Sequence, residues 1–394
     1  MKITIPWHRF LKQKSLTSTG NGFSWGDADE NSYILGDPHL YMSIDPVFEL
    51  LSIDMPKLIQ PEIVKAFSVL TSNVENLPID GVQSPEKMIM QINKAFKRSR
   101  QALEDLQALG YIDTFMECNK TIKRLQRAQI DANSIKAAIK AGKIKNVSVA
   151  KGFLPKRDGS LSLPEYSITR TLTGRMTITK GPQILTAPKF IRKFLKSSYP
   201  GGKIAQVDFI SLEPRVAMQL TEENLGDDIY NYLSEKLFTS KVSRSVVKKL
   251  VLCAVYGASE ATLKKGLPED VDIKKIVEKT KELLNYKLVV NQQLESFRKT
   301  GKIKNYFGRP ITPQGSRESL LYNNFIQSSA VDVALLGFGK ILDKAPERVR
   351  PIFFIHDAML IDLHPEDIEE FKKLSSSIFI DELGEFPLEF QLLE

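Results

Sequence analysis

Cysteine and histidine are scarce in this chain of 394 residues, which holds two and four of them respectively. Cys118 and Cys253 lie far apart and in different expected elements, so a disulfide is not expected and a reducing compartment is favoured. The absence of a Cys/His cluster excludes a structural zinc site. The sequence has no run of 18 or more apolar residues and no signal-peptide pattern after Met1, so neither membrane spanning nor secretion is expected.

The composition is typical of a folded protein of two or three domains, with 42% hydrophobic residues. Its net charge of +8 is unevenly distributed. Between Gln91 and Arg157 fifteen Lys and Arg stand against five acids, whereas from Asp362 to Glu394 ten acids stand against two lysines. This asymmetry predicts a track for a polyanion on one lobe only. The alternative is a basic surface that is merely solvated.

Two helices are expected at the start of the basic segment. Ser84-Pro85 is typical of an N-cap followed by Pro in the first turn, and Gly110 is expected to end that helix. A second helix is expected over Lys120–Ile130, where four cations recur at i, i+3, i+4 and i+7 and would share one face. These four are Lys120, Lys123, Arg124 and Arg127.

The segment Lys203–Ala217 predicts a short strand, Ile204–Val207, then a turn and a helix that carries Glu213 and Arg215. The strand delivers Asp208 at its end. A carboxylate at the tip of a buried strand is costly unless a metal or a cation pairs with it, so Asp208 is a candidate metal ligand. The alternative is that Asp208 only caps the following helix.

The segment Ser243–Gly257 has no internal Pro or Gly and predicts one helix. Along it Arg244, Lys248, Leu252 and Tyr256 recur every four residues and share a broad face. Two cations and a phenol on one stripe could bind a polyphosphate and stack beneath a base. The alternative is a basic amphipathic helix on the surface.

The segment Arg350–Leu363 consists of two apolar runs separated by His356-Asp357, which predicts a hairpin. An ionisable pair at the tip of an otherwise apolar hairpin contributes little to packing, so it indicates a role in the chemistry of a functional site. The final apolar segment, Phe386–Leu393, is expected to return as a strand of the same sheet.

Three of these segments resemble, in their order and spacing, motifs A, B and C of the family A nucleic-acid polymerases, the DNA polymerase I class. They are Lys203–Ala217, Ser243–Gly257 and Arg350–Leu363. Further elements stand where the family places them, namely Thr173-Gly174-Arg175, Gly308-Arg309, Asn323 and Gln327. The resemblance covers about residues 160 to 394. It implies an α+β fold shaped as a right hand, with an antiparallel palm sheet, helical fingers and a helical thumb.

The resemblance also implies a division of the chain. Residues 1–80 form a region of unknown role, 81–155 the thumb, 156–240 the first part of the palm, 241–324 the fingers and 325–394 the second part of the palm. The first 80 residues are too few for a 3′–5′ exonuclease domain, so proofreading by this chain is not expected.

The implied activity is extension of a primer 3′-hydroxyl with dNTPs by two Mg²⁺ ions, with Mn²⁺ as an alternative. Asp208 and Asp357 would bind the metals. Arg244 and Lys248 would hold the β- and γ-phosphates, with Lys248 also donating a proton to the leaving pyrophosphate. Tyr256 would lie beneath the nascent base pair.

Primer–template DNA is the implied partner, and its phosphates would be contacted without reading sequence. The residues expected to bind DNA are Arg175, Lys120, Lys123, Arg124, Arg127, Arg309, Asn323, Gln327 and His356. A monomer working with accessory replication proteins is expected, in the cytoplasm, or in the host cytoplasm if the gene belongs to a phage or mobile element.

Two positions depart from the family pattern. Ala358 follows Asp357 where many family DNA polymerases have Glu, and Leu252 stands where they usually have Phe or Tyr. Both favour an alternative, a single-subunit RNA polymerase; a catalytically weak nucleic-acid-binding homologue is a third interpretation. Glu213 favours DNA synthesis, because the family places a bulky acid there, against the sugar C2′ and the tyrosine at 256, to exclude a 2′-hydroxyl.

Overall fold

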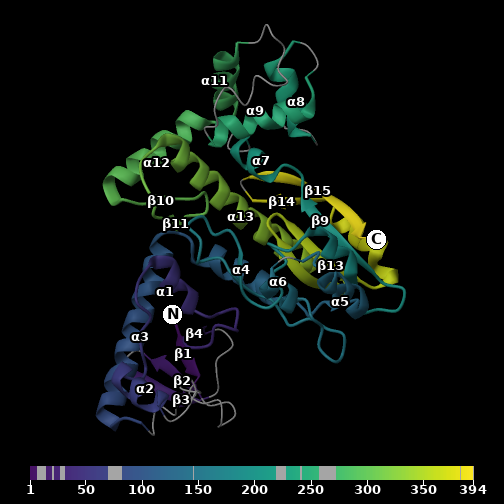
Figure 1. Ribbon diagram of the computed structural model, residues 1–394. Coiled ribbons are helices and arrows are strands. Elements are labelled where there is room, and N and C mark those ends of the chain that lie inside the picture. Colours follow the sequence, from purple (N-terminus) through teal and green to yellow (C-terminus); the bar gives the residue numbers. More distant parts are fainter. Residues whose placement is uncertain are drawn as a thin grey trace. The chain divides into compact units, whose positions relative to one another are not determined.

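The chain divides into two compact units, Met1–Lys123 (unit 1) and Arg124–Glu394 (unit 2). A computed structural model, drawn in Figure 1, describes residues 1–6, 15–19, 22–26, 32–69, 82–144, 146–218, 228–239, 242–256, 272–381 and 383–393. The division falls within residues 81–155, the range expected to form the thumb. Gly257, the expected end of the second motif's helix, lies outside the described residues.

Unit 1 combines a small sheet with helices. Its strands are β1 (Ile3–Pro6), β2 (Ser15–Thr19), β3 (Gly22–Gly26) and β4 (Tyr33–Ile34), in the spatial order β3-β2-β1-β4. Its described helices are α1 (Asp45–Leu51), α2 (Pro61–Ser68), α3 (Pro85–Ala108) and α4 (Ile112–Lys123). The β1 strand pairs antiparallel with β2 and parallel with β4.

The α3 helix confirms the first helix prediction. It begins at Pro85 after the N-cap Ser84, and Gly110, with a φ of 75°, follows its end. Its apolar stripe is buried, and Phe96 on this stripe lies 6.1 Å, between ring centroids, from Phe23 of β3. One face of α3 therefore contributes to the core of unit 1.

The prediction of a helix over Lys120–Ile130 is wrong. The α4 helix ends at Lys123, and the chain becomes extended because its backbone finds other partners. Gln126 N donates to Pro351 O at 2.8 Å, and residues Gln129–Ile130 form the strand β5. The four cations expected on one helical face are consequently divided between a helix and an irregular segment; they are Lys120, Lys123, Arg124 and Arg127.

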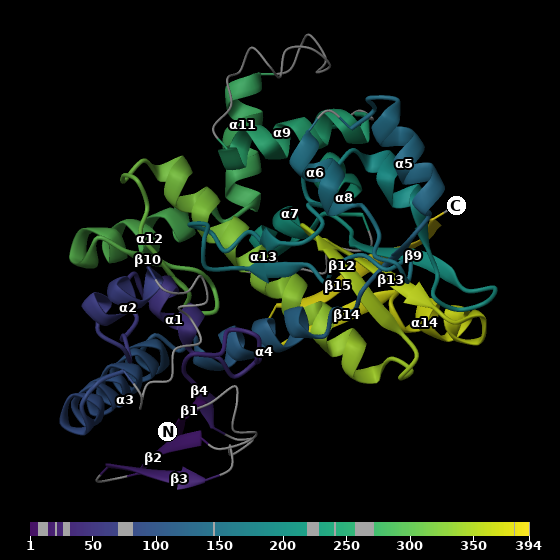
Figure 2. The ribbon, with the colours of Figure 1, turned by 60° about the horizontal axis from the view of Figure 1, so that its bottom comes forward.

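Unit 2 is built on a five-stranded antiparallel sheet with the order β12-β13-β9-β15-β14 (Figure 2). These strands are β9 (Lys203–Phe209), β12 (Arg350–Ile355), β13 (Ala358–Leu363), β14 (Ser377–Ile380) and β15 (Gly384–Leu393). The strand, hairpin and returning strand predicted from the sequence are thus confirmed, and together they form four of the five strands.

Each face of this sheet is covered by other elements of unit 2. The long helix α13 (Glu318–Lys344) packs on one face, where Phe338 meets Phe209 at 5.2 Å between ring centroids. On the other face Ile204 and Leu360 join a core with α5 (Ala132–Lys140), α6 (Val147–Gly152) and the 3₁₀ helix η2 (Lys189–Phe194). The α+β class and the antiparallel sheet agree with the prediction.

The remaining elements of unit 2 surround this sheet. The helices are α7 (Leu212–Met218), α8 (Ile229–Leu237), α9 (Arg244–Tyr256), α11 (Ile273–Leu283), α12 (Tyr286–Thr300), the 3₁₀ helix η3 (Pro365–Asp367) and α14 (Ile368–Leu374). The short strands are β6 (Glu165–Ser167), β7 (Thr177–Lys180), β8 (Leu195–Lys196), β10 (Ile303–Lys304) and β11 (Pro310–Ile311). Figure 1 shows α8, α9 and α11 gathered beyond α7.

The α13 helix is, within the described part of the chain, long and apolar enough to cross a membrane by length and composition. Its qualifying window is, however, 72% buried inside the protein. It therefore has the surroundings of a core helix, covered by the sheet on one side and by neighbouring helices elsewhere.

Gly337 of α13 makes close packing against the sheet possible, and we expect Gly337→Ala to destabilise the protein. An added Cβ would lie 2.8 Å from Phe209 Cζ and 3.3 Å from Ile378 Cγ2. Overpacking typically costs about 1–3 kcal/mol, which exceeds the gain of about 1 kcal/mol from replacing a helical Gly with Ala. Urea denaturation measures the change. Gly26→Ala, where nothing lies within 4 Å, is the control and should stay within about 0.5 kcal/mol of the parent.

Candidate active site

Asp208 lies on β9 between two neighbouring strands. It is paired with Ala358 of β13 on one side and with Glu389 of β15 on the other. Directly opposed residues of an antiparallel sheet point to the same face, with Cβ atoms about 4.5–5.5 Å apart. The register therefore places the Glu389 carboxylate beside Asp208, and an uncharged methyl group on the opposite flank.

The turn between β12 and β13 carries His356 and Asp357. His356 adopts a φ of 57°, in the left-handed region. The backbone oxygen of Asp357 accepts a hydrogen bond from Phe209 N at 3.1 Å, which ties the turn to the end of β9. Asp208 and Asp357 consequently line the same cavity, as their positions in the sequence predicted.

Both carboxyl groups are held in an environment that disfavours their charge. Burial raises the pKa of Asp208 to about 7, with further contributions from the negative charges of Asp357 and Glu389. A hydrogen bond from Gln206 and the positive charge of Arg192 partly oppose this shift. Burial is also the main cause of the raised pKa of Asp357. The field around the pair is thus negative and only partly compensated.

This arrangement fits a divalent cation. Mg²⁺ takes oxygen ligands and is commonly bound by one or two carboxylates together with substrate phosphates. A cation between Asp208 and Asp357 would relieve both their repulsion and the cost of their burial. Among the residues that the structure describes, no three Asp, Glu, His or Cys side chains already form a metal cage. The two carboxylates therefore suit an ion that substrate helps to hold.

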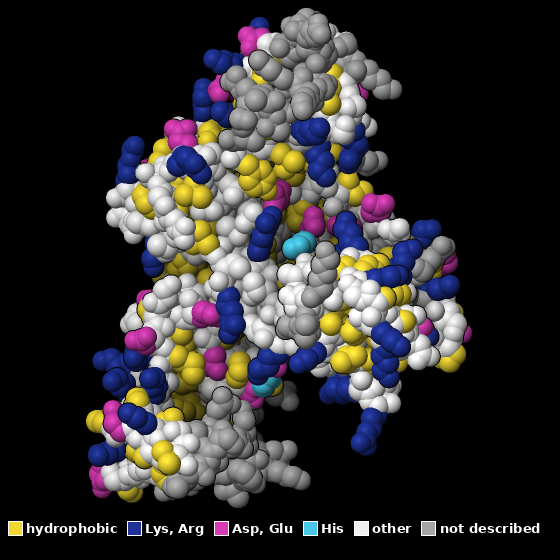
Figure 3. All heavy atoms as spheres, viewed as in Figure 1, with side chains coloured by type: hydrophobic (Ala, Val, Ile, Leu, Met, Phe, Trp, Pro, Cys, Tyr) yellow, Lys and Arg dark blue, Asp and Glu magenta, His cyan; other side chains and the backbone are white. Residues whose placement is uncertain are grey.

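The cavity, about 410 Å³ in volume, lies between the end of β9, α7 and α9. From α9 it is lined by the stripe predicted from the sequence, which consists of Arg244, Lys248, Leu252 and Tyr256. On the face shown in Figure 3, acidic side chains lie in the middle of unit 2, with Lys and Arg side chains around them. The carboxylates and the cations predicted from separate motifs thus meet in one place.

The two cations of α9 differ in their surroundings. Arg244 Nε donates to Asp228 Oδ2 at 2.9 Å, and its guanidinium lies 4.8 Å from the centre of the Tyr230 ring. Lys248 is exposed and lines the same cavity. Arg244 is therefore held in a fixed direction, whereas the Lys248 ammonium can move towards a ligand.

Glu213 connects α7 to α9. Tyr256 Oη donates to Glu213 Oε2 at 2.5 Å, and Arg175 Nη2 donates to Glu213 Oε1 at 3.1 Å. Burial, followed by this hydrogen bond, raises the pKa of Tyr256. Glu213 thus contacts the tyrosine of the second motif, rather than Arg215 or a lysine on its own helix face.

Thr173-Gly174-Arg175 lies in a turn, in which Gly174 N donates to Thr171 O at 3.2 Å, and β7 follows it. The side-chain amide of Gln327 can be oriented so that both its nitrogen and its oxygen have hydrogen-bond partners. In that orientation the nitrogen donates to Thr173 Oγ1 at 2.6 Å, and the oxygen accepts from Arg175 Nη2 at 2.9 Å. Asn323 precedes Gln327 by one turn of α13. The turn is thereby tied to the helix that supports the sheet.

Arg309 lies beneath this turn. It is 1% exposed and donates to Ile168 O. Gly174 has a φ of 78°, and a Cβ there would lie 2.7 Å from Arg309 Cζ, so both the backbone and the close approach require glycine. The buried guanidinium therefore supports the turn that carries Arg175. Arg309 was expected to bind DNA, but a side chain that is 1% exposed is not accessible to it.

The cations predicted to line DNA have separate partners. Lys120 pairs with Glu117 at 3.4 Å, and Lys123 Nζ donates to Pro38 O at 2.6 Å. Arg124 pairs with Asp343 of α13. Arg127 is exposed. The hypothesis of one cationic helix face is therefore corrected, since no single helix carries these side chains.

Two residues beside Asp208 were not identified from the sequence. Glu389 lies in the site because the register of β15 pairs it with Asp208. Gln206 lies there because its Nε2 donates a hydrogen bond to Asp208 Oδ2 at 3.3 Å. The alternation Phe386, Leu388, Phe390 marks one face of β15, which does place Glu389 on the opposite face. The register that pairs it with Asp208 could be read only from the folded sheet.

The raised pKa of Asp208 predicts a pH-dependent cost to stability. The ordinary value is 3.8, so between about pH 4 and 7 the folded protein keeps a proton that the unfolded chain has lost. The contribution of Asp208 to the free energy of unfolding therefore falls as pH rises through this window. In metal-free buffer, Asp208→Asn should stabilise the protein relative to the parent at about pH 8 and much less at about pH 4.

Urea denaturation in EDTA at the two pH values tests this expectation. Glu389→Gln is the matched variant, and it should give a smaller gain of the same sign, because Glu389 is one cause of the raised pKa. Added Mg²⁺ should stabilise the parent at the higher pH more than it stabilises Asp208→Asn. A gain for Asp208→Asn that is the same at both pH values would contradict the assignment.

Comparison with known families adds an independent observation. Residues 91–392 match DNA polymerase family A, which is well over half of the chain. No curated protein matches the chain. Members of this family generally use divalent metal ions, in keeping with the pair of carboxylates. The chain therefore belongs to DNA polymerase family A and is a DNA-directed DNA polymerase, a nucleotidyltransferase that acts on primer–template DNA and dNTPs.

Proposed function

We propose that this chain extends a primer by two-metal phosphoryl transfer at the cavity between β9, α7 and α9. The observation that carries the proposal is the convergence of Asp208 of β9 and Asp357 of the turn before β13, two half-buried carboxyl groups with raised pKa values. Two bound Mg²⁺ ions would activate the primer 3′-hydroxyl and neutralise the leaving pyrophosphate. Mn²⁺ has similar ligand preferences and is the alternative ion.

In this proposal the sheet of unit 2 is the palm, formed by residues 156–240 and 325–394. The fingers are residues 241–324, which include α9 and α11, and the thumb is drawn from residues 81–155. The mixed architecture with an antiparallel sheet supports the right-hand arrangement.

The α9 cations are proposed to hold the triphosphate. Arg244 and Lys248 line the cavity that contains the carboxylates, where they would meet the β- and γ-phosphates. Arg244 would exchange its bond to Asp228 for a phosphate oxygen. Lys248 is the proposed donor of a proton to the pyrophosphate, because a lysine ammonium can lose a proton far more readily than an arginine guanidinium. Tyr256 would lie beneath the nascent base pair.

Contacts to DNA are proposed for residues around the Thr173–Arg175 turn. Arg175, fixed by Glu213 and Gln327, is the proposed minor-groove contact, since acceptors there are alike on every base pair. Asn323, Gln327 and His356 would add positioning contacts. Phosphate contacts are proposed for Lys120, Lys123, Arg124 and Arg127 as separate groups.

Asp208→Asn and Asp357→Asn should each reduce primer extension by more than about a hundredfold, because loss of a direct metal ligand costs more than loss of an outer-shell partner. Binding to primer–template duplex in Ca²⁺ buffer should change little. Single-turnover extension and fluorescence anisotropy measure the two quantities. Asp381→Asn, which changes an exposed carboxylate paired with Lys340, is the control. Retention of more than a few per cent of the activity by either variant would sink the metal assignment.

A preference for dNTPs over rNTPs is proposed to depend on Glu213. Its bonds to Tyr256 and Arg175 hold the carboxylate at the edge of the cavity, where a 2′-hydroxyl would clash or leave a polar group unpaired. The second candidate, RNA synthesis, is favoured by Leu252 and Ala358, both of which lie near this cavity. The third interpretation, nucleic-acid binding without efficient catalysis, would show as no extension in either metal.

Glu213→Ala should lower the dNTP/rNTP selectivity about tenfold or more, chiefly through a rise in kcat/KM for rNTPs. Tyr256→Phe is the matched variant, because it keeps the ring and removes only the hydroxyl that holds Glu213, and it should give a smaller loss of selectivity. Single-nucleotide insertion kinetics with each substrate provide the ratio. If the parent already inserts rNTPs as readily as dNTPs, the RNA polymerase interpretation takes the place of this one.

A further inference from the structure

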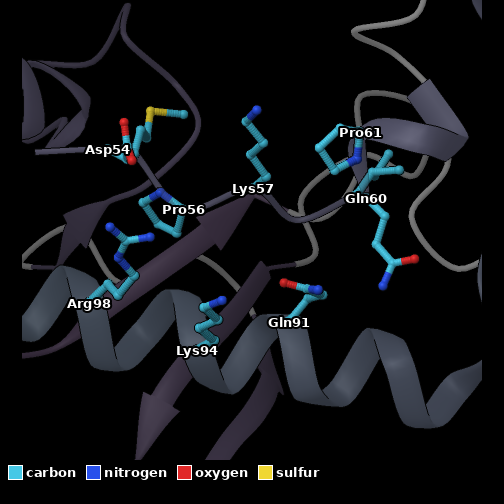
Figure 4. A pocket seen from close by; sticks show the side chains of 10 residues that line it. Asp54, Pro56, Lys57, Gln60, Pro61, Gln91, Lys94 and Arg98 are labelled. Carbon is cyan, nitrogen blue, oxygen red and sulfur yellow. The ribbon is translucent and has the colours of Figure 1, made fainter. Parts of the chain in front are cut away.

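Unit 1 contains a second cavity, of about 450 Å³, distant in sequence from the catalytic residues. One wall is α3, which contributes Gln91, Lys94 and Arg98. The other is the segment from Asp54 to Pro61, which leads into α2 (Figure 4). Its size is in the range of small-ligand pockets. None of its lining residues belongs to the cavity that contains Asp208 and Asp357.

The fold holds both walls in place. Pro56 is buried, and Leu58 O accepts a hydrogen bond from Gln83 Nε2 at 3.0 Å, so the segment is fastened to the residues that precede α3. The adjoining face of α3 is part of the core of unit 1. The segment also ends in the N-terminus of α2, whose dipole adds partial positive charge at Gln60 and Pro61.

Three cations line this cavity against one acid. Lys57 comes from the segment, Lys94 and Arg98 from α3, and the acid is Asp54. In Figure 4 the side chains of Lys94 and Arg98 rise from the helix towards the segment, and Figure 3 shows Lys and Arg side chains gathered over α3. Lys94 and Arg98 are spaced i, i+4, where like charges destabilise a helix. A bound anion would remove that cost.

Besides these charges, the lining combines the amides of Gln60 and Gln91 with an apolar surface. Met55, 44% exposed, and Ile59 stand beside the prolines at 56 and 61. A ligand that suits this cavity has a phosphate for the cations and a flat, largely apolar part for the Met, Ile and Pro surface. A nucleotide has both. In duplex DNA the bases are stacked inside the helix, so only an unpaired strand can offer a base to such a cavity.

We propose that this cavity binds a nucleotide of single-stranded DNA, with its phosphate on Lys57, Lys94 and Arg98 and its base against Met55 and Ile59. Unit 1 would then hold an unpaired strand of the substrate. The proposal uses the membership of the chain in a DNA polymerase family, which makes DNA its ligand. It does not use the roles given to Asp208, Asp357 or Glu213.

The test compares two triple variants of the full chain that remove the same charge. The pocket variant is Lys57→Gln, Lys94→Gln and Arg98→Gln. The control, Lys87→Gln, Lys97→Gln and Arg100→Gln, changes α3 outside the cavity. Fluorescence anisotropy with a labelled oligothymidylate, over a series of salt concentrations, gives the affinity and its salt slope. Thermal unfolding of both variants shows that they fold.

The pocket variant should bind the single strand at least about threefold more weakly than the control, and its log–log salt slope should be smaller by about 0.7, the value for one phosphate contact on a single strand. A bromodeoxyuridine-substituted oligonucleotide, irradiated with the parent, should crosslink to the peptide that contains Met55. The crosslink should be lost in the pocket variant.

Equal losses in the two triple variants would overturn the proposal, because they would show only an effect of net charge. Displacement of the oligothymidylate by dTTP or inorganic phosphate at low concentration, with no crosslink at Met55, would assign the cavity to a free nucleotide or phosphate instead. Primer extension by the parent is measured separately. If the parent does not extend primers, the proposed catalytic roles fail, and the binding comparison still decides the role of the cavity.

Discussion

The antiparallel register of β9 between β13 and β15 is the constraint on which the catalytic site depends. It places the turn that carries Asp357 at the end of the strand that carries Asp208, and it adds Glu389 from the other side. Burying these charges is unfavourable, and the packing of the apolar layers on both faces of the sheet offsets that free-energy cost. The same packing holds the strands in place, so the carboxyl groups cannot move apart. The core thus keeps the carboxylates close together despite their mutual repulsion, which a bound cation would reduce.

The helices add specificity to this charged centre through a chain of polar contacts. Gln327 of α13 holds Arg175, Arg175 holds Glu213, and Glu213 holds Tyr256 of α9. Each member is fixed by the next, so the position of α9 depends on a turn that lies far from it in sequence. Arg309, buried below that turn, supports the first link from the protein interior.

Much of this site was predictable because its residues lie within continuous motifs. Asp208 and the Arg244–Tyr256 stripe follow from strand and helix periodicity over a few residues, and the hairpin around Asp357 from two apolar runs. Glu389 was missed because its place depends on a pairing between strands about 180 residues apart. The helix expected over residues 120–130 failed for a related reason. The local pattern was helical, but backbone bonds to β12 and neighbouring segments took precedence.

The left-handed backbone at His356 limits which residues can occupy this position of the turn that carries Asp357. Only glycine adopts a φ of 57° without cost, and Asn, Asp and His tolerate it better than other residues. A β-branched residue would be excluded whatever its side chain could do. Glycine would satisfy the backbone but would loosen the tip of the hairpin, because it has more freedom to lose on folding. Histidine is therefore one of the few residues that combines a rigid tip with an exposed polar side chain at this position.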